Sequence, residues 1–324
     1  MNSLLVKNSL HEQFLGNTMK IKCFCLLFAA LLLASCAQNI VTTTSEDDEW
    51  IMLGVLKKGW FWDIYAVTVN DPGKLVPDIG YIDDKPSWSP DNQWIVYSTR
   101  HKGLEDASKI YVVKVDGTSR TKIAKGDRPA WSPKGDQIVF TYRGELFLFS
   151  FKCITDNIAC DAEPSLLTAG RNPDWSPDGN AIVYEIHESI YVIETATSKI
   201  QELYTPQDGG CAEPDWSSTD IIIFRCWGEN RGFYTVDSNG ENFKRVALND
   251  IGGVYPKWSP SGTKFAFISY LSINSVSGAT TAAYVVNADG SNLIRLTPSD
   301  DDKVQWLAWM PQGMKPEDCQ FFCQ

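Results

Sequence analysis

Short apolar runs recur along the chain, and each is bounded by polar turn residues. In several of them the hydrophobic side chains are consecutive, so that both faces of the segment are apolar. A strand with two apolar faces is one that lies between two neighbours in a packed protein. The clearest runs are Ile95–Tyr97, Ile138–Phe140, Ile182–Tyr184 and Phe265–Phe267. The pattern predicts buried strands at regular intervals, and the Gly, Pro and Asn-Gly residues between them argue against a helical repeat.

Each of these runs follows the same hairpin motif. The stretch PDWSPDGNAIVYE at 173 recurs as KPSWSPDNQWIVY at 85, RPAWSPKGDQIVF at 128, EPDWSSTDIIIFR at 213 and YPKWSPSGTKFAF at 255, with a partial copy, LAWMPQG, at 307. The motif tryptophans stand at 88, 131, 175, 216, 258 and 309, so the spacings are 43, 44, 41, 42 and 51 residues. Four antiparallel strands in a repeat of about 40–45 residues are typical of a β-propeller blade.

The two ends of the chain complement each other. The last copy supplies one strand around Trp309, whereas WIMLGV at 50, DIYAVTV at 63 and KLVPDI at 74 supply three strands with no Trp-Ser-Pro strand before them. Together they complete a sixth blade and leave no free sheet edge. The predicted fold is an all-β, six-bladed propeller over residues 49–313, closed by one C-terminal and three N-terminal strands.

The Pro-x-Trp-Ser-Pro-Asp-Gly hairpin, followed by Ile-Tyr-Val and an Asp-Gly turn, resembles the TolB-like β-propeller repeat over roughly residues 48–313. The resemblance implies a propeller. It leaves the function open, because this repeat occurs in envelope scaffold proteins and in the propeller domain of prolyl-oligopeptidase-type peptidases. The fourth unit departs from the motif at Ser218 and Thr219, which leaves its turn type open.

Residues 1–36 read as a leader with a lipoprotein signal. From Met19 the sequence has Lys20 and Lys22, then a 12-residue apolar stretch, then Leu33-Ala34-Ser35-Cys36, which resembles a bacterial lipobox. We expect translation to start at Met19, cleavage before Cys36 and lipidation of Cys36; the alternative is an ordinary secretory signal. Residues 37–48 form a polar, flexible tether and residues 314–324 a C-terminal tail. The expected location is extracytoplasmic, on a lipid anchor in the bacterial membrane, and on the outer membrane or periplasmic side in a Gram-negative cell.

Charge excludes two classes of partner. The chain has a net charge of −11, and removal of residues 1–36, which hold three Lys and one Glu, leaves −13. A surface this acidic argues against nucleic acid and against adhesion to anionic lipid. Contact with the membrane is therefore expected through the N-terminal lipid only.

The six cysteines beyond Cys36 fall into local pairs, as expected for disulfides in an exported chain. Cys211 and Cys226 are symmetric about Ser218–Thr219. The candidates are Cys153 with Cys160, Cys211 with Cys226, and Cys319 with Cys323. Buried thiols are the alternative, and spacing alone leaves the connectivity open.

Catalytic signals are weak. Beyond the leader the chain has only His101 and His187, each in a loop, and it has no Gly-x-Ser-x-Gly elbow, metal-ligand spacing or cofactor motif. Asp174 and Asp215 resemble an acid/base pair, but their identical position before the repeat Trp favours an architectural role. The repeat tryptophans are predicted to pack between blades rather than to bind a ligand. We expect no enzymatic activity, no metal and no cofactor.

Binding residues are sought where the repeat varies. The residue three before each Trp is unpatterned and is expected at the mouth of a central channel: Lys85, Arg128, Asn172, Glu213, Tyr255 and Trp306. Loops after the second strands are expected to open on the same face, with Trp60, Arg100, Tyr142, Arg143, Trp227, Arg231 and Tyr270. Exposed Trp, Tyr and Arg anchor interfaces.

The sequence thus favours a non-enzymatic propeller that binds another envelope protein, or a peptide segment of one, at this face. A receptor for carbohydrate or cell-wall fragments is the alternative, because aromatic, Arg and Asn side chains also suit a glycan. The third hypothesis is a propeller-type lyase or glycosidase. The simplest alternative to all three is that these positions vary without a binding role because they lie on a solvent-exposed face.

Overall fold

A computed structural model of the chain describes residues 49–56, 62–68, 84–99, 108–152, 163–248, 251–270, 281–297 and 303–318. The chain divides into two compact units, Met1–Glu46 and Asp47–Gln324. All described residues belong to the second unit, and they begin at residue 49, so the predicted leader, Cys36 and the whole of the predicted tether lie outside them. Among the described residues, no helix has the length and apolar character needed to cross a membrane.

Four sheets each contain four antiparallel strands that are consecutive in the sequence. Repeat one holds β3 (Asp84–Trp88), β4 (Trp94–Thr99), β5 (Lys109–Lys114) and β6 (Thr121–Lys125). Repeat two holds β7 (Asp127–Trp131), β8 (Gln137–Tyr142), β9 (Glu145–Ser150) and β10 (Ser165–Ala169). Repeat three holds β11 (Arg171–Trp175), β12 (Ala181–Ile186), β13 (Ser189–Glu194) and β14 (Ile200–Tyr204). Repeat four holds β15 (Gly210–Trp216), β16 (Ile221–Trp227), β17 (Gly232–Asp237) and β18 (Lys244–Arg245).

The remaining strands form one larger sheet that contains both ends of the described chain. Repeat five supplies β19 (Val254–Trp258), β20 (Lys264–Tyr270), β21 (Thr281–Asn287) and β22 (Ile294–Arg295). Next to it stand β23 (Lys303–Trp309), β1 (Trp50–Leu56) and β2 (Trp62–Thr68), and a short 3-10 helix, Pro316–Asp318, follows. A single parallel pairing, Thr281 with Lys303, joins the two parts of the sheet. The prediction of an all-β chain built from four-stranded antiparallel sheets is confirmed.

The C-terminal strand pairs with the N-terminal one. β1 runs antiparallel to β23 from Ile51, opposite Trp309, to Leu56, opposite Lys303, and its other edge pairs with β2. Just before β1, Glu49 accepts a 3.0 Å bond from Lys264 Nζ in repeat five. The predicted third N-terminal strand, KLVPDI at 74, lies outside the described residues.

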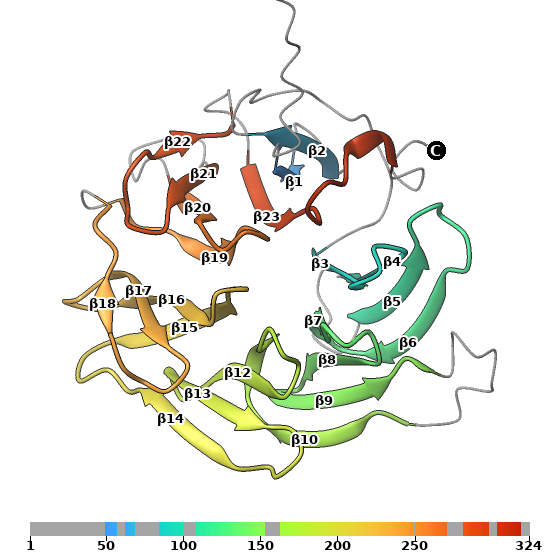
Figure 1. The fold of residues 1–324 in the computed structure, drawn as a ribbon, viewed down its shortest axis with the longest axis horizontal. Helices are drawn as coiled ribbons and strands as arrows, with labels where there is room; N and C mark the ends of the chain where they lie inside the picture. The colour runs from blue at the N-terminus through green and yellow to red at the C-terminus, as the bar shows by residue number, and fades with distance from the viewer. Residues whose placement is uncertain are drawn as a thin grey trace, which may run out of the picture. The chain divides into compact units, whose positions relative to one another are not determined.

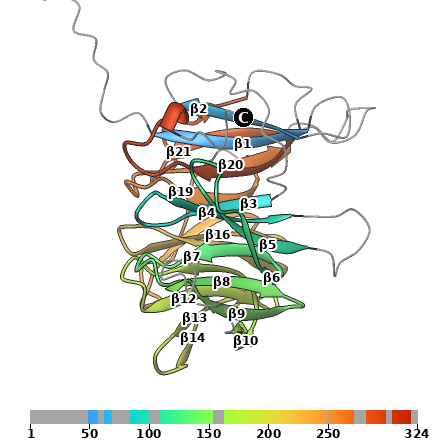
Figure 2. The same cartoon turned by 90° about the vertical axis from the view of Figure 1, so that its right-hand side faces the viewer.

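The sheets surround a common centre, as Figure 1 shows, with β3, β7, β15, β19 and β23 nearest to it and β6, β10, β14, β18 and β22 outermost. In the side view of Figure 2, the strands run across the molecule from one face to the other. This arrangement buries both faces of each second strand, so that β4 is buried at every position. The consecutive apolar runs of the sequence are the direct consequence of that burial.

The repeat tryptophans belong to the core, as predicted. Their side chains lie between sheets and are buried at 131, 175, 216, 258 and 309. Two of them also donate through the indole to the innermost strand of the preceding repeat: Trp175 Nε1 lies 3.1 Å from the Ala130 carbonyl oxygen, and Trp309 Nε1 lies 2.8 Å from that of Lys257. The tryptophans therefore register one sheet against the next as well as filling space.

The hairpin of repeat four keeps the turn of the other repeats. Asp220 has a φ of 65°, and its main-chain N–H donates to the Ser217 carbonyl, as Gly179 (φ 66°) does to Ser176 in repeat three. An aspartate tolerates this left-handed conformation because its short polar side chain bonds locally, here by accepting from Trp216 Nε1 at 2.8 Å. The departure at Ser218 and Thr219 thus leaves the turn unchanged.

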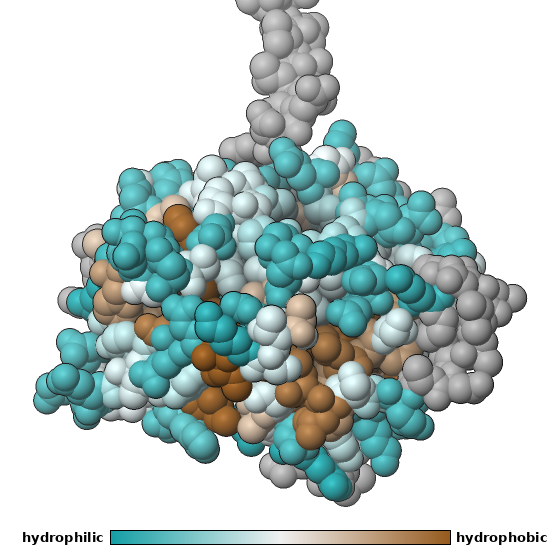
Figure 3. Space-filling view, turned by 60° about the horizontal axis from the view of Figure 1, so that its bottom comes forward, coloured by the Kyte–Doolittle hydropathy of each residue, from teal (hydrophilic) through white to brown (hydrophobic). Residues whose placement is uncertain are grey.

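A few large hydrophobic side chains of the described residues are exposed. Figure 3 shows hydrophobic residues gathered low on a face that is otherwise mainly hydrophilic. The exposed large hydrophobic residues are Leu166, Ile200, Phe243 and Tyr270. Phe243 stacks on Tyr204 with ring centres 4.4 Å apart and so completes an aromatic cluster outside repeat four.

One of the predicted disulfides is present. Cys211 on β15 and Cys226 on β16 are directly paired across the strands and are bonded to each other, with Cα atoms 4.1 Å apart. Both side chains are buried. The other predicted pairs, Cys153 with Cys160 and Cys319 with Cys323, lie outside the described residues.

We expect the double variant Cys211→Ala/Cys226→Ala to lose about 3 kcal/mol of unfolding free energy, because the bond closes a loop of about 15 residues in the unfolded chain. Urea unfolding, followed by tryptophan fluorescence, measures this loss. Reductant should lower the wild-type value toward that of the variant. Equal stabilities of the two oxidised proteins would show that the bond does not constrain the unfolded state.

Candidate functional site

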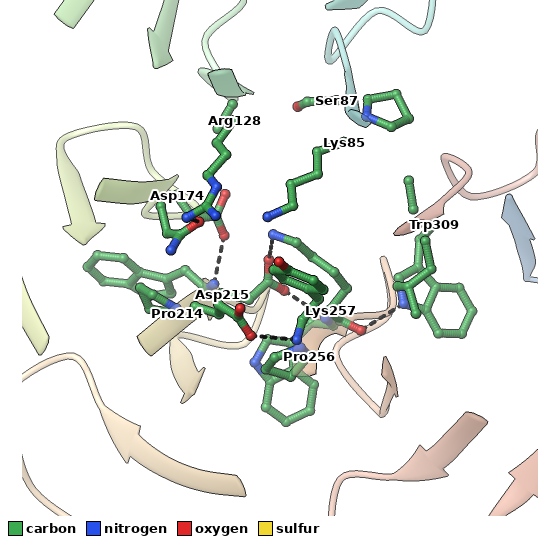
Figure 4. A pocket seen from close by; sticks show the side chains of 18 of the residues that line it. Lys85, Ser87, Arg128, Asp174, Pro214, Asp215, Pro256, Lys257 and Trp309 are labelled. Atoms are coloured by element: carbon green, nitrogen blue, oxygen red, sulfur yellow. Dashed lines mark hydrogen bonds and ion pairs between the residues drawn. The ribbon is translucent and has the colours of Figure 1, made fainter. Parts of the chain in front are cut away.

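A cavity of about 310 Å³ runs along the centre of the sheets. The innermost strands β3, β7, β11, β15, β19 and β23 all contribute residues to its wall, from the residue three before each Trp to Ser217 and Ser259 just after. Figure 4 shows Lys85, Arg128 and Lys257 extending from different strands toward its middle. The six residues predicted at the channel mouth all belong to the lining of this one cavity.

Five of these residues share an uncommon backbone conformation. The φ angles are 47° at Lys85, 53° at Arg128, 50° at Asn172, 58° at Glu213 and 54° at Tyr255. Positive φ is rare outside glycine, and here it coincides with a shift of strand register in every one of the five strands. The following proline disfavours the right-handed helical region for the residue before it. The bulge turns the side chains of these five residues toward the cavity. We call Lys85, Arg128, Asn172, Glu213 and Tyr255 the channel-mouth residues.

The channel-mouth residues contact one another across repeats. Arg128 donates through Nη1 to the Asn172 side-chain oxygen. Lys85 Nζ lies 3.8 Å from the centre of the Tyr255 ring, a cation–π contact between β3 and β19. Glu213 accepts from Arg225 Nε at 2.8 Å and from the main-chain N–H of Tyr255 at 2.7 Å. The mouth is therefore an ordered polar layer rather than a set of independent side chains.

Asp174, Asp215 and Lys257 form a second layer further along the cavity, each directly before its repeat Trp. Asp174 accepts from the main-chain N–H of Trp216, and Asp215 from that of Trp258, both at 2.7 Å. Lys257 donates to Asp215 in a close ion pair. The two carboxylates thus hold neighbouring repeats together, which supports the architectural role expected for them.

Burial and mutual repulsion perturb this layer. Burial, reinforced by the nearby Asp215 carboxylate, raises the pKa of Asp174 to about 7, although Lys257 and the Trp216 N–H act in the opposite direction. Burial opposes the charge of Lys257, but the Asp215 and Asp174 carboxylates outweigh it and raise the pKa of the lysine above its ordinary value. Lys257 is therefore the shared counter-charge of Asp174 and Asp215, and Asp174 is the residue of this layer whose pKa is raised to about 7.

Trp306, the sixth residue predicted at the channel mouth, differs from the other five because its side chain is buried. Its exposed fraction is 1 %, and it packs in a core cluster with Met52, Ile95 and Tyr97. A Cβ atom at Gly54 would lie 2.2 Å from the indole nitrogen, so β1 needs glycine at that point. The sixth copy has Leu307 where the others have proline and no positive φ at 306. Its register shift falls at Gln305, so that Trp306 stays paired with Gly54 on β1.

The loop residues form a separate group. Tyr142, Arg143, Trp227, Arg231 and Tyr270 lie at or just beyond the ends of the second strands, beside the channel-mouth end of the innermost strands, but none lines the central cavity. Trp227 carries Arg225 over its ring at 4.9 Å, which places it next to Glu213. Trp60 and Arg100 lie outside the described residues, as does His101. Within the described part of the chain, no cluster of three or more His, Cys, Asp or Glu side chains could hold a metal ion.

The sequence reasoning missed Lys257 as a site residue. Its position before the repeat Trp holds Ser87, Ala130, Asp174 and Asp215 in the other repeats, so a lysine there was the visible exception. Only the structure shows that this lysine reaches the aspartate of the neighbouring repeat. A change of charge sign at an equivalent position was the signal that could have revealed it.

Radial four-stranded sheets around a lined central cavity define a repeat-built β-propeller. The profile of the TolB beta propeller domain matches residues 38–220, which is more than half of the chain. The chain belongs to this family.

Solved structures show the same fold at low sequence identity. A TolB from Acinetobacter baumannii aligns with a TM-score of 0.63 and 18 % identity over 81 % of this chain and 67 % of that one. A TolB protein from Agrobacterium tumefaciens aligns with a TM-score of 0.55 and 19 % identity over 82 % and 99 %. A structure of puromycin hydrolase aligns with a TM-score of 0.50 and 13 % identity over 80 % and 46 %. No curated protein gives a significant sequence match to the chain.

The perturbed carboxyl gives a pH test of stability. Because the pKa of Asp174 is about 7 in the folded chain and near 3.8 without the fold, folding takes up a proton between these values, and stability falls as pH rises through this window. Between pH 5.5 and pH 8, we expect the unfolding free energy of the wild type to fall by about 1–2 kcal/mol relative to that of Asp174→Asn. Urea unfolding of both proteins at the two pH values measures the difference.

Asp178→Asn serves as the matched control. Bonds from Ser176 and Asn180 lower the pKa of Asp178, so this carboxyl stays ionised over the whole window and its substitution should cost the same at both pH values. If the difference in unfolding free energy between the wild type and Asp174→Asn is the same at both pH values, the raised pKa of Asp174 is refuted.

The burial of the Trp306 side chain can be tested by substitution. We expect Trp306→Ala to lower the unfolding free energy by about 3–5 kcal/mol, because it empties a buried site between β1, β23 and repeat one. Tyr270→Ala, which removes an aromatic ring that is 58 % exposed, should change it by less than about 0.5 kcal/mol. Thermal unfolding of the two variants measures both, and similar melting temperatures would contradict the buried placement.

Proposed function

We propose that this protein is a non-enzymatic, extracytoplasmic propeller that binds a segment of another cell-envelope protein at the mouth of its central channel. The observation that carries the proposal is the set of five left-handed residues that aim different side chains into one cavity. The backbone is the same in each repeat, whereas the side chains are a lysine, an arginine, an amide, an acid and a phenol. A uniform frame with varied side chains is how repeat proteins present a recognition surface.

The shape of the site favours a protein segment. A cavity of about 310 Å³ accepts a few side chains, and the rim adds Tyr142, Trp227 and Arg231, residue types that anchor protein interfaces. The likeness to TolB structures supports the fold of such a scaffold. A propeller of similar fold, with a TM-score of 0.56 and 8 % identity, occurs in a structure of a nidogen/laminin complex, in which one protein binds another.

Catalysis has less support. The carboxyl with the perturbed pKa, Asp174, bonds to the main chain of the next repeat, and Lys257, which acts on it electrostatically, is paired with Asp215. The likeness to puromycin hydrolase covers less than half of that protein and concerns the fold alone.

We further propose that the propeller has six blades, with β23, β1, β2 and the segment near residue 74 forming the sixth. The lining of one cavity by six innermost strands and the pairing of β1 with β23 support this count. A lipid on Cys36 with residues 37–48 as a tether would hold the propeller at the membrane surface. The lipobox-like sequence supports that part of the proposal.

Site-specific photo-cross-linking in cells tests the binding site. The photoreactive residue p-benzoylphenylalanine replaces Tyr255 in one variant and Ile200, which is 49 % exposed on the outer strand β14, in the control. We expect a defined cross-linked protein from position 255 and none from position 200, because only the former faces the channel. Adding Arg128→Ala to the first variant should weaken the product several-fold.

Identical products from both positions, or no product from position 255, would contradict the proposal. Thermal unfolding of both variants checks that each is folded before the cross-linking result is read.

A further inference from the structure

A small hollow, separate from the central cavity, lies at the seam between repeats four and five. It has a volume of about 20 Å³, and its lining includes two arginines, Arg231 and Arg245, and three buried apolar side chains, those of Phe233, Val246 and Leu248. A hollow of this size accepts about one or two oxygen-sized atoms. It therefore suits the head of one polar group rather than a whole ligand.

This seam lies on the same face of the propeller as the channel mouth. β17 begins at Gly232, which pairs with Cys226 on β16, and Cys226 pairs in turn with Cys211 near the start of β15. The start of β15 is the end that leads to Glu213, one of the channel-mouth residues. Arg231, directly before β17, is therefore on the face from which the channel opens.

The Arg245 side chain is held against the main chain of the seam. Its Nη2 donates to the Arg231 carbonyl oxygen at 2.9 Å. A Cβ atom at Gly232 would lie 2.9 Å from Arg245 Nε, so the glycine leaves the space that the guanidinium occupies. This contact fixes the position of Arg245 and uses one of the five donors of its guanidinium.

Among the residues that the structure describes, neither of these two arginines has a carboxylate partner. Both are exposed, in a chain whose net charge is −11. Two guanidiniums that line one small hollow repel each other, and an anion between them removes this repulsion. The hollow therefore favours an anionic group.

An exposed aromatic residue follows the wall of the hollow. Ser269 Oγ donates to the carbonyl oxygen of Gly252, a lining residue, at 2.6 Å, and so fixes the end of β20 against the hollow. The next residue, Tyr270, is exposed. Because Arg and Tyr are enriched in protein interfaces, the seam has the composition of a contact surface.

We infer that the seam between repeats four and five binds a carboxylate, an aspartate or glutamate side chain of the bound protein segment, between Arg231 and Arg245. The inference rests on the proposed function and extends the contact from the channel mouth to the rim of the same face. The planar guanidinium fork matches the two oxygens of a carboxylate, and bonds of this kind are about twice as strong as neutral ones. The apolar lining accommodates the methylene group that carries the carboxylate.

Small probes test this site without a known partner. Propionate and propionamide have the same shape, and only the first is charged; dimethyl phosphate carries one negative charge on a different oxyanion. The full chain is labelled with ¹⁵N-arginine, and the Nε–H signals of Arg231 and Arg245, assigned with Arg231→Gln and Arg245→Gln, are followed during titration at constant ionic strength. We expect both signals to shift saturably with propionate, more weakly with dimethyl phosphate, and not with propionamide.

Charge variants complete the test. Arg231→Gln and Arg245→Gln should each weaken propionate binding about fivefold, measured from the signal of the remaining arginine. Lys244→Gln removes the same charge from the exposed neighbour of Arg245 on β18, whose side chain points to the other face of the strand, and should leave binding unchanged. Unshifted signals of the other arginines in each variant show that the fold is intact. No saturable shift, an equal response to propionamide, tighter binding of dimethyl phosphate, or an equal loss in Lys244→Gln would overturn the inference.

The probe and the cross-linking experiments fail independently. Cross-linking from position 255 reports a protein partner at the channel mouth, whatever the seam binds. A cross-linked partner with no preference for propionate would therefore leave the proposed function standing and remove the carboxylate site. A clear preference for propionate without a cross-linked partner would support the carboxylate site and contradict the proposed function.

Discussion

Each of the five interfaces between consecutive innermost strands, from β3–β7 to β19–β23, contains a hydrogen bond donated by the repeat tryptophan, and the rest of the structure depends on this registration. Where the residue before the tryptophan is Ser87, Asp174 or Asp215, its side chain accepts from the main-chain N–H of the next repeat's tryptophan. Where it is Ala130 or Lys257, its carbonyl accepts from the next indole instead. Two chemical solutions therefore satisfy the same need, which is to fix each sheet against the one before it around a crowded centre.

Each innermost strand of five to seven residues therefore contains positions that hold the repeats together and one position whose side chain varies between repeats. The tryptophan and the residue before it hold the repeats together, through a side chain where that residue is Ser or Asp and through its carbonyl where it is Ala130 or Lys257. Three residues before the tryptophan, the left-handed bulge releases the side chain from the strand pairing and turns it into the channel. Chemistry can change there without disturbing the frame. The sixth strand shows the converse: it has neither the proline nor the positive φ, and the side chain of Trp306 lies in the core.

The charged inner layer has a thermodynamic consequence. The carboxylates of Asp174 and Asp215 share one lysine in a buried wall, so ionising both of them is unfavourable. The pKa of Asp174 therefore rises to about 7. The net charge of the channel wall then depends on pH near neutrality.

Much of this architecture was determined by the sequence alone. A repeat of about 40–45 residues, apolar runs on both faces of the second strands and the spacing of the tryptophans dictate stacked four-stranded sheets, because a strand buried on both sides must be apolar throughout. The symmetry of Cys211 and Cys226 about their turn predicted the bond between them. The positions of five channel-mouth residues also followed, since they are the unpatterned points of a repeated motif. What the tertiary structure decided is which residues from different repeats meet: the Lys257 contact with Asp215, the perturbed Asp174 and the burial of Trp306. The first two arise between strands about 40 residues apart, and the third between strands more than 200 residues apart. A periodic sequence specifies its repeat unit, but not the side-chain contacts that form where the units meet around a common centre.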